Sequence, residues 1–506
     1  MADDGIDDAA ESGWDDLEAI AEDEQARNAT DEVDTVSRAR RGALVAGRAL
    51  GGLIGAGVAA AVIVGLSVLP LPTIASPVTT VVLEPTELPR TLVCPDGAVV
   101  LGNDPVAAEL RLSTLGKANR QVAGSPQATT GLNPAAGAEG GSGPQAIQAA
   151  GTGLSVLHAA QAQRVNRNRL QGFVATGCVA ASYEQWLVGG STAVGRTSLI
   201  QLTNPGETSA TVSLRAYGSD GEAGATDGLV VAPGAERIVS LASFARSLDD
   251  PVIRVQSTGS PVAAQLQTTV ERSLAPGGAD QFAAISQPVT DSVIVGVRIA
   301  GAEAVAQASL GEGMDDLAPV LRLFSPTGAA ASVEVQITAL PNAAAPNAPT
   351  GVVATLVEDL AAEAVLEVPL NTLPDGQYQI RVRSEVPVLA AARVSYLTSA
   401  GSELVWQQAS PWLDGTIALA VAQGPGARIA IAAEDDASVS LTGPQGTSTV
   451  TVPQGGTVIP AEAGAWSVVS DLPIAIAVVY TGQSGGAAAY PVPGAPAAAD
   501  AVTVHY

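Results

Sequence analysis

The chain has 506 residues, of which 24 are Lys or Arg and 50 are Asp or Glu, so its formal net charge is −26. This length allows three or four domains. The excess of acid argues against a protein that binds nucleic acid through a basic surface, and we expect no nucleic-acid partner.

The acidic residues gather at the N-terminus. Residues 1–37 hold 14 carboxylates and a single base, Arg27. Like charges at this density repel one another, and the few apolar residues cannot form a core. Residues 1–41 are therefore predicted to be a disordered tail.

A long uncharged segment follows a basic cluster. Ala49 to Leu69 contains 21 residues without a charge, which as a helix would span roughly 30 Å, the hydrocarbon thickness of a bilayer. The basic cluster consists of Arg38, Arg40, Arg41 and Arg48, and the next basic residue after the segment is Arg90. The pattern predicts one transmembrane helix within 42–69, with the N-terminus in the cytoplasm and the rest of the chain outside. A signal peptide cleaved near Ala75 is the alternative.

The two cysteines, Cys94 and Cys178, both fall on the predicted outer side, where disulfides persist. A bridge between them would close a loop of about 85 residues and contribute roughly 4 kcal/mol to stability. Two free thiols are the alternative. A metal site would need further ligands, and none with suitable spacing lies nearby, so we expect no metal and no cofactor.

Beyond the membrane segment, the sequence changes character several times. Residues 70–92 are rich in proline and predict an extended stalk. Residues 93–181 predict a β region bounded by the cysteines. Within it, residues 118–151 are of low complexity, rich in Gly, Ala, Ser, Pro and Gln, and are expected to form a long flexible loop.

From Ser182 onward, strand patterns and turn residues alternate. In 211–217, Val212, Leu214 and Ala216 share one face, as expected of a half-buried strand. Three segments each read as a strand ending near a serine, a short turn with proline and a second apolar strand; the prolines are Pro261, Pro387 and Pro473. This weak repeat predicts tandem modules of about 100 residues with an immunoglobulin-like β-sandwich fold. We place the modules at 182–285, 286–400 and 401–485, followed by a loose tail at 486–506.

Residues able to carry catalysis are scarce. His158 is the one histidine within the expected folded region, and a packed or surface role is favoured over that of a base. Carboxylate pairs occur at Asp249-Asp250, Asp315-Asp316 and Asp435-Asp436, where turn residues exposed to solvent are expected. The five tryptophans, including Trp186, Trp406, Trp412 and Trp466, are expected in the core rather than on a sugar-binding surface. We assign no catalytic residue, and the only special site predicted is the disulfide Cys94–Cys178.

The sequence between Gly177 and Gly234 contains a set of residues that is typical of one protein family. It includes Cys178, Trp186, Gly189-Gly190, Asn204-Pro205 and Pro233-Gly234. The segment resembles an uncharacterised actinobacterial family of single-pass cell-envelope proteins, a domain of unknown function. Cys94-Pro95 is similar to the upstream cysteine of that family, although Asp96 follows where a small residue is expected. The resemblance implies an extracytoplasmic β-rich region and gene neighbours connected with glycosyl transfer and sugar phosphates; it implies no activity.

The sequence thus predicts a mainly β, membrane-anchored, extracytoplasmic scaffold or binding protein of the cell envelope. We expect that the protein has no enzymatic activity and that it binds an envelope protein or a glycan. The alternative is a glycan-active enzyme that uses paired carboxylates, which would need two carboxyl groups facing each other across a cleft.

Overall fold

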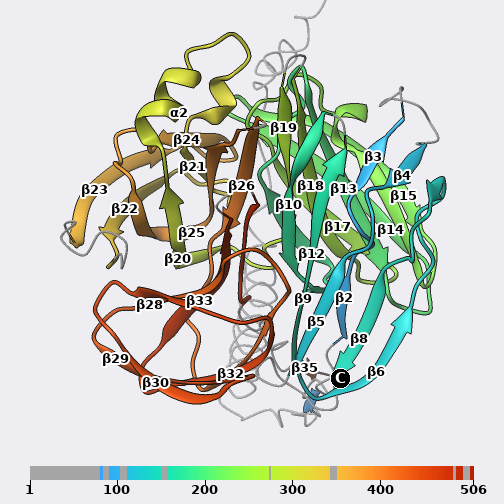
Figure 1. Cartoon of the computed structure of the whole chain (residues 1–506). Coiled ribbons are helices and arrows are strands. Elements are labelled where there is room, and N and C mark those ends of the chain that lie inside the picture. The colour runs from blue at the N-terminus through green and yellow to red at the C-terminus, as the bar shows by residue number, and fades with distance from the viewer. Residues whose placement is uncertain are drawn as a thin grey trace, which may run out of the picture. The chain divides into compact units, whose positions relative to one another are not determined.

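The computed structural model describes residues 80–83, 91–102, 111–149, 157–167, 169–272, 275–341, 350–399, 401–482, 486–493 and 502–505 (Figure 1). The protein is mainly β, as predicted. Its contacts define two compact units, and the larger one spans Glu84–Val502. A separate two-stranded sheet is formed by β1 (Thr80–Leu83) and β35 (Val502–His505).

The expected transmembrane helix within 42–69 and the acidic tail 1–41 lie outside the described residues, as does most of the stalk 70–92. In the ranges that are described, the structure contains no helix with the length and apolar character needed to cross a membrane.

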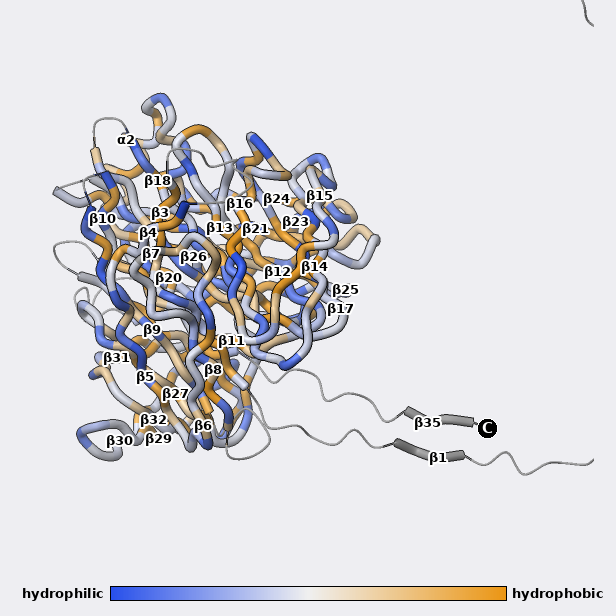
Figure 2. The backbone as a smooth tube through the Cα atoms, turned by 90° about the vertical axis from the view of Figure 1, so that its right-hand side faces the viewer, coloured by the Kyte–Doolittle hydropathy of each residue, from blue (hydrophilic) through white to orange (hydrophobic). Residues whose placement is uncertain are grey.

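Eight strands after the second cysteine, here called the first set, form two groups of four. One sheet has the order β12-β17-β14-β15, and the other strands, in the order β16-β13-β18-β19, belong to a larger sheet. The alternating faces predicted from the sequence are confirmed, since Val212, Leu214 and Ala216 on β14 are fully buried. Figure 2 shows apolar residues along β12 and β14. The bounds are β12 (Glu184–Val188), β13 (Arg196–Asn204), β14 (Ala210–Gly218), β15 (Gly221–Val231), β16 (Ala235–Ser240), β17 (Val252–Thr258), β18 (Ala263–Glu271) and β19 (Pro276–Ala283).

The second set has the same arrangement, except that the single long strand β25 belongs to both groups of strands. The first half of β25 pairs with β20 and β22, and its second half pairs with β21 and β26. The outer strands are β23, beside β22, and β24, beside β21. The bounds are β20 (Val289–Ile299), β21 (Val320–Phe324), β22 (Ala331–Ala339), β23 (Gly351–Leu360), β24 (Val365–Pro369), β25 (Gly376–Leu397) and β26 (Ser402–Gln408).

The third set forms two separate four-stranded sheets, in the orders β27-β32-β29-β30 and β31-β28-β33-β34. The bounds are β27 (Thr416–Val421), β28 (Ala427–Ala433), β29 (Ala437–Gly443), β30 (Gly446–Val452), β31 (Thr457–Pro460), β32 (Gly464–Ser470), β33 (Ile474–Thr481) and β34 (Ala487–Pro491).

All three sets share one topology. In each, the first strand pairs with the sixth, the sixth with the third and the third with the fourth; the fifth, second, seventh and eighth form the other group. The repeated Ser/Pro segments lie where the sixth strand passes into the seventh. Two expected boundaries differ from this grouping. β26 lies after residue 400 but pairs with β25, and β34, within the expected loose tail, pairs with β33.

The strands before residue 181 form a shorter N-terminal set. Its sheets have the orders β11-β2-β8-β6 and β5-β9-β10, and β10 pairs in parallel with β19. A small sheet, β3-β4-β7, is added to it. The bounds are β2 (Thr91–Cys94), β3 (Val99–Leu101), β4 (Leu112–Thr114), β5 (Asn119–Gly124), β6 (Pro126–Gly131), β7 (Ala138–Glu139), β8 (Gln145–Ala149), β9 (Leu157–Arg167), β10 (Leu170–Gly177) and β11 (Val179–Ala180).

The expectation of a long flexible loop at 118–151 is wrong for its described part, because β5, β6, β7 and β8 lie there. These strands are built from small and polar residues, and β6 is exposed along its whole length. They therefore lack the alternation of apolar residues from which a strand is recognised. Pairing with neighbouring strands, together with the burial of Ala123 on β5 and Ile147 on β8, orders them.

Four strands lie together in the middle of the larger unit, and we call them the final strands. They are the last strands of the first, second and third sets, and β10, the last long strand of the N-terminal set before the two-residue β11. β10 contacts β19 and β34, and β26 contacts β19 and β34, so the four strands form a closed ring. Figure 1 shows β10, β19 and β26 near the centre.

Hydrophobic clusters also join neighbouring sets. One cluster joins the first set to Phe324 and Trp406 of the second, and another joins the second set to Ala430 and Val479 of the third. A further cluster joins the third set to Phe173 of the N-terminal set.

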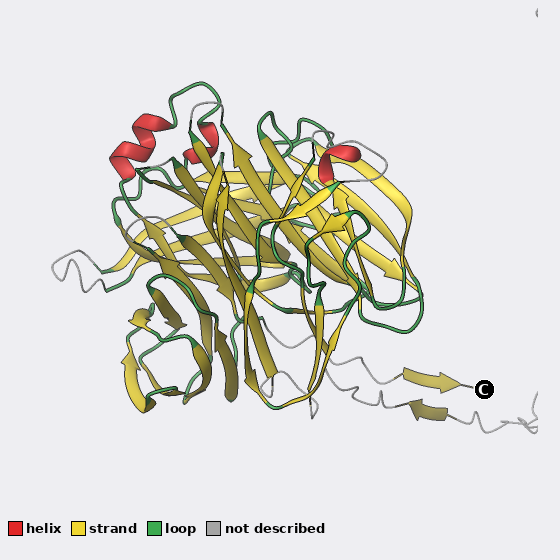
Figure 3. Cartoon of the chain, turned by 45° about the vertical axis from the view of Figure 1, so that its right-hand side comes forward, coloured by secondary structure: helices red, strands yellow, loops and turns green. Residues whose placement is uncertain are grey.

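Helices are few among the described residues. They are α2 (Ala302–Ala308) and two 3-10 helices, Leu241–Ser243 and Asp315–Leu317. Figure 3 shows them at the same end of the molecule. α2 and the second 3-10 helix both belong to the connection between β20 and β21.

Candidate functional site

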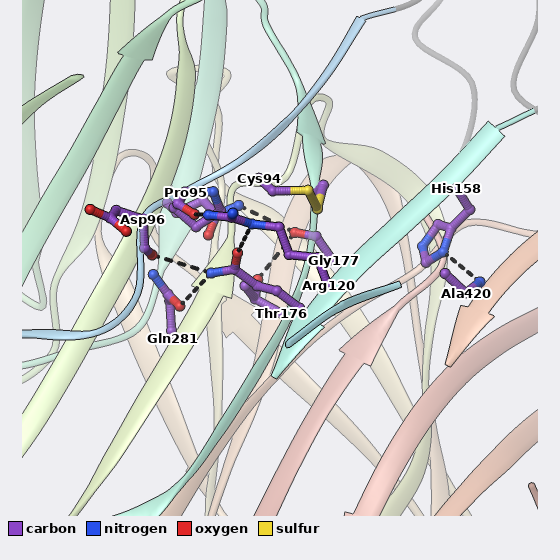
Figure 4. The surroundings of a disulfide bond; sticks show 12 residues. Cys94, Pro95, Asp96, Arg120, His158, Thr176, Gly177, Gln281 and Ala420 are labelled. Carbon is purple, nitrogen blue, oxygen red and sulfur yellow. Dashed lines mark hydrogen bonds between the residues drawn. A yellow bond between two sulfur atoms is a disulfide. The ribbon is translucent and has the colours of Figure 1, made fainter. Parts of the chain in front are cut away.

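The predicted disulfide between Cys94 and Cys178 is confirmed (Figure 4). Cys94 ends β2 and Cys178 follows β10, and both are buried. Directly after the bridge, β11 pairs with β2, so that Val179 lies opposite Val93. The disulfide therefore joins the two sheets of the N-terminal set. It lies close to the residues that connect this set to the first set.

Polar side chains surround the loop after Cys94. Arg120 donates from Nη2 to the carbonyl oxygen of Pro95 at 2.9 Å and from Nε to Gln161 Oε1 at 3.3 Å. Gln161 Nε2 donates in turn to the carbonyl oxygen of Asp96 and to Gln281 Oε1, at 3.3 and 3.4 Å (Figure 4). These contacts fix the course of the loop and connect it to β19.

The carboxylate of Asp96 serves the backbone of the same region. It accepts the N–H of Gly97 at 2.8 Å and the N–H of Gly143 at 3.0 Å. A Cβ at Gly141 would lie 2.1 Å from Asp96 Oδ2, so a larger residue here would displace the carboxylate. At the position where a small residue was expected, the chain thus uses an aspartate to hold the 141–143 turn.

A second carboxyl group, that of Glu236 on β16, lies close to Asp96. Burial raises the pKa of Glu236 to about 8, and the negative charge of Asp96 adds to the effect. Glu236 is therefore mostly uncharged at neutral pH. No sequence pattern pointed to this residue, because its partner lies 140 positions away in the chain.

His158 is packed rather than poised for catalysis. It lies on β9 and is 3% exposed, and its Nδ1 accepts the N–H of Ala420 at 3.0 Å (Figure 4). Its ring stacks on that of Tyr490. Both partners belong to the third set, so the histidine helps to join the N-terminal set to the third.

The carboxylate pairs noted in the sequence are used in turns and ion pairs. Asp250 accepts the N–H of Ser219, and Asp436 accepts the N–H of Gln454. Asp316 binds Arg196 at 2.8 Å and Arg272 at 2.6 Å. Each of these three carboxylates thus has a partner within the fold.

Of the tryptophans expected in the core, Trp186 and Trp406 are buried there, whereas Trp412 and Trp466 are only partly buried and pack against the edges of clusters. Trp186 is 3% exposed and Trp406 is 2% exposed. The guanidinium group of Arg322 lies 4.4 Å from the centre of the Trp406 ring, and Arg322 also binds Glu367 at 2.7 Å. These rings hold the first and second sets together and are not available for stacking on a sugar.

A polar cavity opens where the ring of final strands begins, and we call it the axial pocket. Its volume is about 240 Å³. It is lined by residues of β9, β10, β26 and the turns beside them, among them Arg164, Asn166, Gln171, Ser402 and Glu403. Because these side chains offer both hydrogen-bond donors and acceptors, the pocket can receive a small polar group.

Glu403 is the central residue of the axial pocket. Its Oε2 accepts the N–H of Gly486 and, at 3.1 Å, that of Ala487 on β34. Burial raises the pKa of Glu403 and outweighs the opposite effect of the N–H groups of Gly486, Ala487 and Phe173. The carboxyl thus connects β26 to β34 and β10. In the sequence nothing marks it, because it stands alone in a strand.

The fold and this site define a mainly β, disulfide-bonded protein of repeated strand sets around a central ring. Residues 134–461 match the family of unknown function DUF5719, and the chain belongs to that family. No curated protein and no solved structure shows significant similarity to the chain.

Proposed function

We propose that the protein is a membrane-anchored, extracytoplasmic scaffold or binding protein of the cell envelope, without enzymatic activity. The observation that carries this proposal is the use of its acids and its buried histidine. The carboxylate of Asp96 holds the turn at Gly143, whereas Glu403 and His158 bind backbone groups of a different set from their own. These three side chains are therefore engaged in stabilising the fold.

The fold proposed for this function is a series of immunoglobulin-like β-sandwich modules. In support, each of the first, second and third sets contains two groups of four strands whose buried side chains join in a shared cluster. β-Sandwich modules commonly serve as rigid scaffolds whose surface loops and edges bind partners. This architecture favours a binding function over an enzymatic one.

The proposed location rests on two features. The uncharged segment Ala49–Leu69, preceded by arginines, has the length of one membrane span. The buried disulfide Cys94–Cys178 is of the kind that forms and persists outside the cytoplasm. A single-pass anchor within 42–69 would place the strand sets on the outer side.

The axial pocket is the proposed contact for a glycan end, while the surfaces of the sets could contact an envelope protein. Planar amide, guanidinium and carboxyl groups such as Gln171, Arg164 and Glu403 match the hydroxyl groups of a sugar as donors and acceptors.

One observation favours the alternative, a glycan-active enzyme. Glu403 combines a raised pKa with a place on a cavity, as a general acid would. Against it, the neighbouring carboxyl group of Asp280 is fully buried and accepts the N–H of Trp406. A glycosidase needs a second carboxyl group on the same cleft, and Asp280 does not line the pocket.

Two experiments test the proposal. Cysteine labelling of intact cells should reach Thr73→Cys and not Ser12→Cys; labelling of Ser12→Cys from outside would refute the topology. Crosslinking and pull-down from membranes, read for protein and polysaccharide, should then identify the partner.

Cellular function should survive His158→Ala, Asp249→Asn with Asp250→Asn, and Asp435→Asn with Asp436→Asn. Glu403→Gln decides between the two functions. If this variant folds and keeps its partner but loses cellular function, the enzyme replaces the scaffold as the conclusion.

A further inference from the structure

A second cavity lies in the second set, away from the axial pocket. Its volume is about 420 Å³, within the range of small-molecule sites. The helix α2 covers it on one side, and the end of β20 and the second half of β25 form the other side. Ile299, Val394 and Leu373 line it and are buried in the core of the set.

The chain segment that builds this cavity is an addition to the repeated topology. Between the first and second strands, the first set has seven connecting residues, 189–195, and the third set has five, 422–426. The second set has 20 residues, 300–319, at the same place. The other two sets fold without such a segment, so the topology does not require it.

The added segment is held in position at both ends. The N–H groups of Gly301 and Ala302 donate to the carboxylate of Asp375 at 3.0 and 2.7 Å. At the other end, Asp316 binds Arg196 and Arg272. α2 is thus held over the cavity by contacts that do not fill it, while Val305 closes its inner side.

The lining selects one class of ligand. Most of its lining residues are apolar, and five are polar: Glu303, Gln307, Ser309, Asn371 and the buried Ser395. None of the lining residues is Lys, Arg or His, so nothing there would neutralise an anionic head group. The carboxylate of Glu303 would repel one.

We propose that this cavity binds the hydrocarbon part of a neutral amphiphile, with its polar head near Glu303. This site is independent of the scaffold function proposed above and of the axial pocket. The affinity comes from burial of the ligand's hydrocarbon chain against the apolar lining residues. Because no lining residue is a cation, a neutral head group should be preferred to an anionic one.

The test uses the purified extracytoplasmic region from residue 84 onward and the neutral fluorophore N-phenyl-1-naphthylamine, whose emission rises in an apolar site. We expect saturable binding and displacement by 1-dodecanol, with weaker displacement by dodecanoate at the same concentration. The variant Glu303→Gln should reduce the difference between the alcohol and the carboxylate.

Two alanines of α2 provide a matched pair of variants. Both Ala304 and Ala306 are exposed, but Ala306 lines the cavity and Ala304 does not. Ala306→Phe should weaken binding of the fluorophore about tenfold or more, because the ring occupies the space of the ligand. Ala304→Phe places the same ring on the same helix and should bind as the parent protein does.

Circular dichroism and thermal unfolding of both variants establish that they fold. Fluorescence that does not saturate, or equal binding by Ala306→Phe and Ala304→Phe, would overturn the proposal. Stronger displacement by dodecanoate than by 1-dodecanol would overturn the proposed preference for a neutral head.

Discussion

At the scale of single residues, buried carboxyl groups stand where different strand sets meet. Asp280 on β19 accepts the N–H of Trp406 on β26, and Glu403 on β26 accepts N–H groups of β34. These final strands contact one another without forming a continuous ladder, so backbone donors at their edges need other partners. The carboxyl groups supply acceptors there.

Such burial has a consequence for stability against pH. Burial raises the pKa of Glu236 and that of Asp280 to about 8, whereas unfolded carboxyls titrate near pH 4. Between these values the native protein holds protons that the unfolded chain has released. The contribution of these two groups to the free energy of unfolding should therefore be full below about pH 4 and be lost as the pH rises from there to about 8.

Thermal unfolding at pH 5, 7 and 9 measures this dependence. The variant Glu236→Gln, which cannot ionise at that position, should show a smaller decrease in Tm from pH 5 to pH 9 than the parent protein. A parent Tm that increases over this interval would contradict the prediction.

The disulfide makes its contribution mainly by constraining the unfolded chain. Cys94 and Cys178 are 84 positions apart, so replacing both with Ala should lower the free energy of unfolding by about 4 kcal/mol. Denaturation by urea measures the change. The same loss should appear when the parent protein is unfolded with reductant present, and an unchanged midpoint in both experiments would refute the estimate.

Residue-level features were predictable only where the residue type alone restricts the role. A chain with two cysteines leaves one possible bridge, and two of the tryptophans in this aromatic-poor chain, Trp186 and Trp406, lie in the core. Glu403 and Glu236 carry no such signal. Their role comes from burial beside strands that are distant in sequence, which a single sequence does not reveal.

At the scale of elements, the fourth strands of the sets are sheet edges, and β23 is the least protected of them. Val352, Val353 and Val357 on it are 59%, 46% and 68% exposed. β15, by comparison, carries glycines and acidic residues along its length, and β30 is rich in Ser and Thr. A long exposed apolar edge favours pairing with another chain.

Val357→Lys should reduce aggregation of the protein on mild heating, measured by light scattering. Val357 lies opposite Glu334 on β22, so the new ammonium group gains a partner while it protects the edge. Val194→Lys is the control, because Val194 is 93% exposed but lies in a turn. Equal improvement by both variants would assign the effect to charge alone.

Element prediction succeeded where one face of a strand is buried and failed where both faces are small or polar. β14, with Val212, Leu214 and Ala216 on one face, shows the alternation that defines a strand. β5 and β6 consist largely of Gly, Ala, Thr, Gln and Asn, and neighbouring strands order them. The long connection that holds α2 was also not foreseen, since its helical segment is a single short one.

At the scale of the whole molecule, the closed ring predicts that the larger unit unfolds as one. The first and last parts of the chain share a core, in which Phe173 of β10 lies 5.1 Å from Tyr480 of β33, measured between ring centres. Separate modules on a string would unfold independently, but here each set lacks part of its core without its neighbours. Calorimetry of the larger unit should show a single transition.

A local change then tests whether stability is shared around the ring. Phe173→Ala, in the N-terminal set, should destabilise the protein by about 3–5 kcal/mol through the cavity that it leaves. If the ring is one cooperative unit, hydrogen exchange should accelerate in β28 and β33 of the third set and equally in β14 and β17 of the first, which Phe173 does not touch. Acceleration confined to the third set would mean that the sets unfold separately, and the ring would then be an assembly of independent parts.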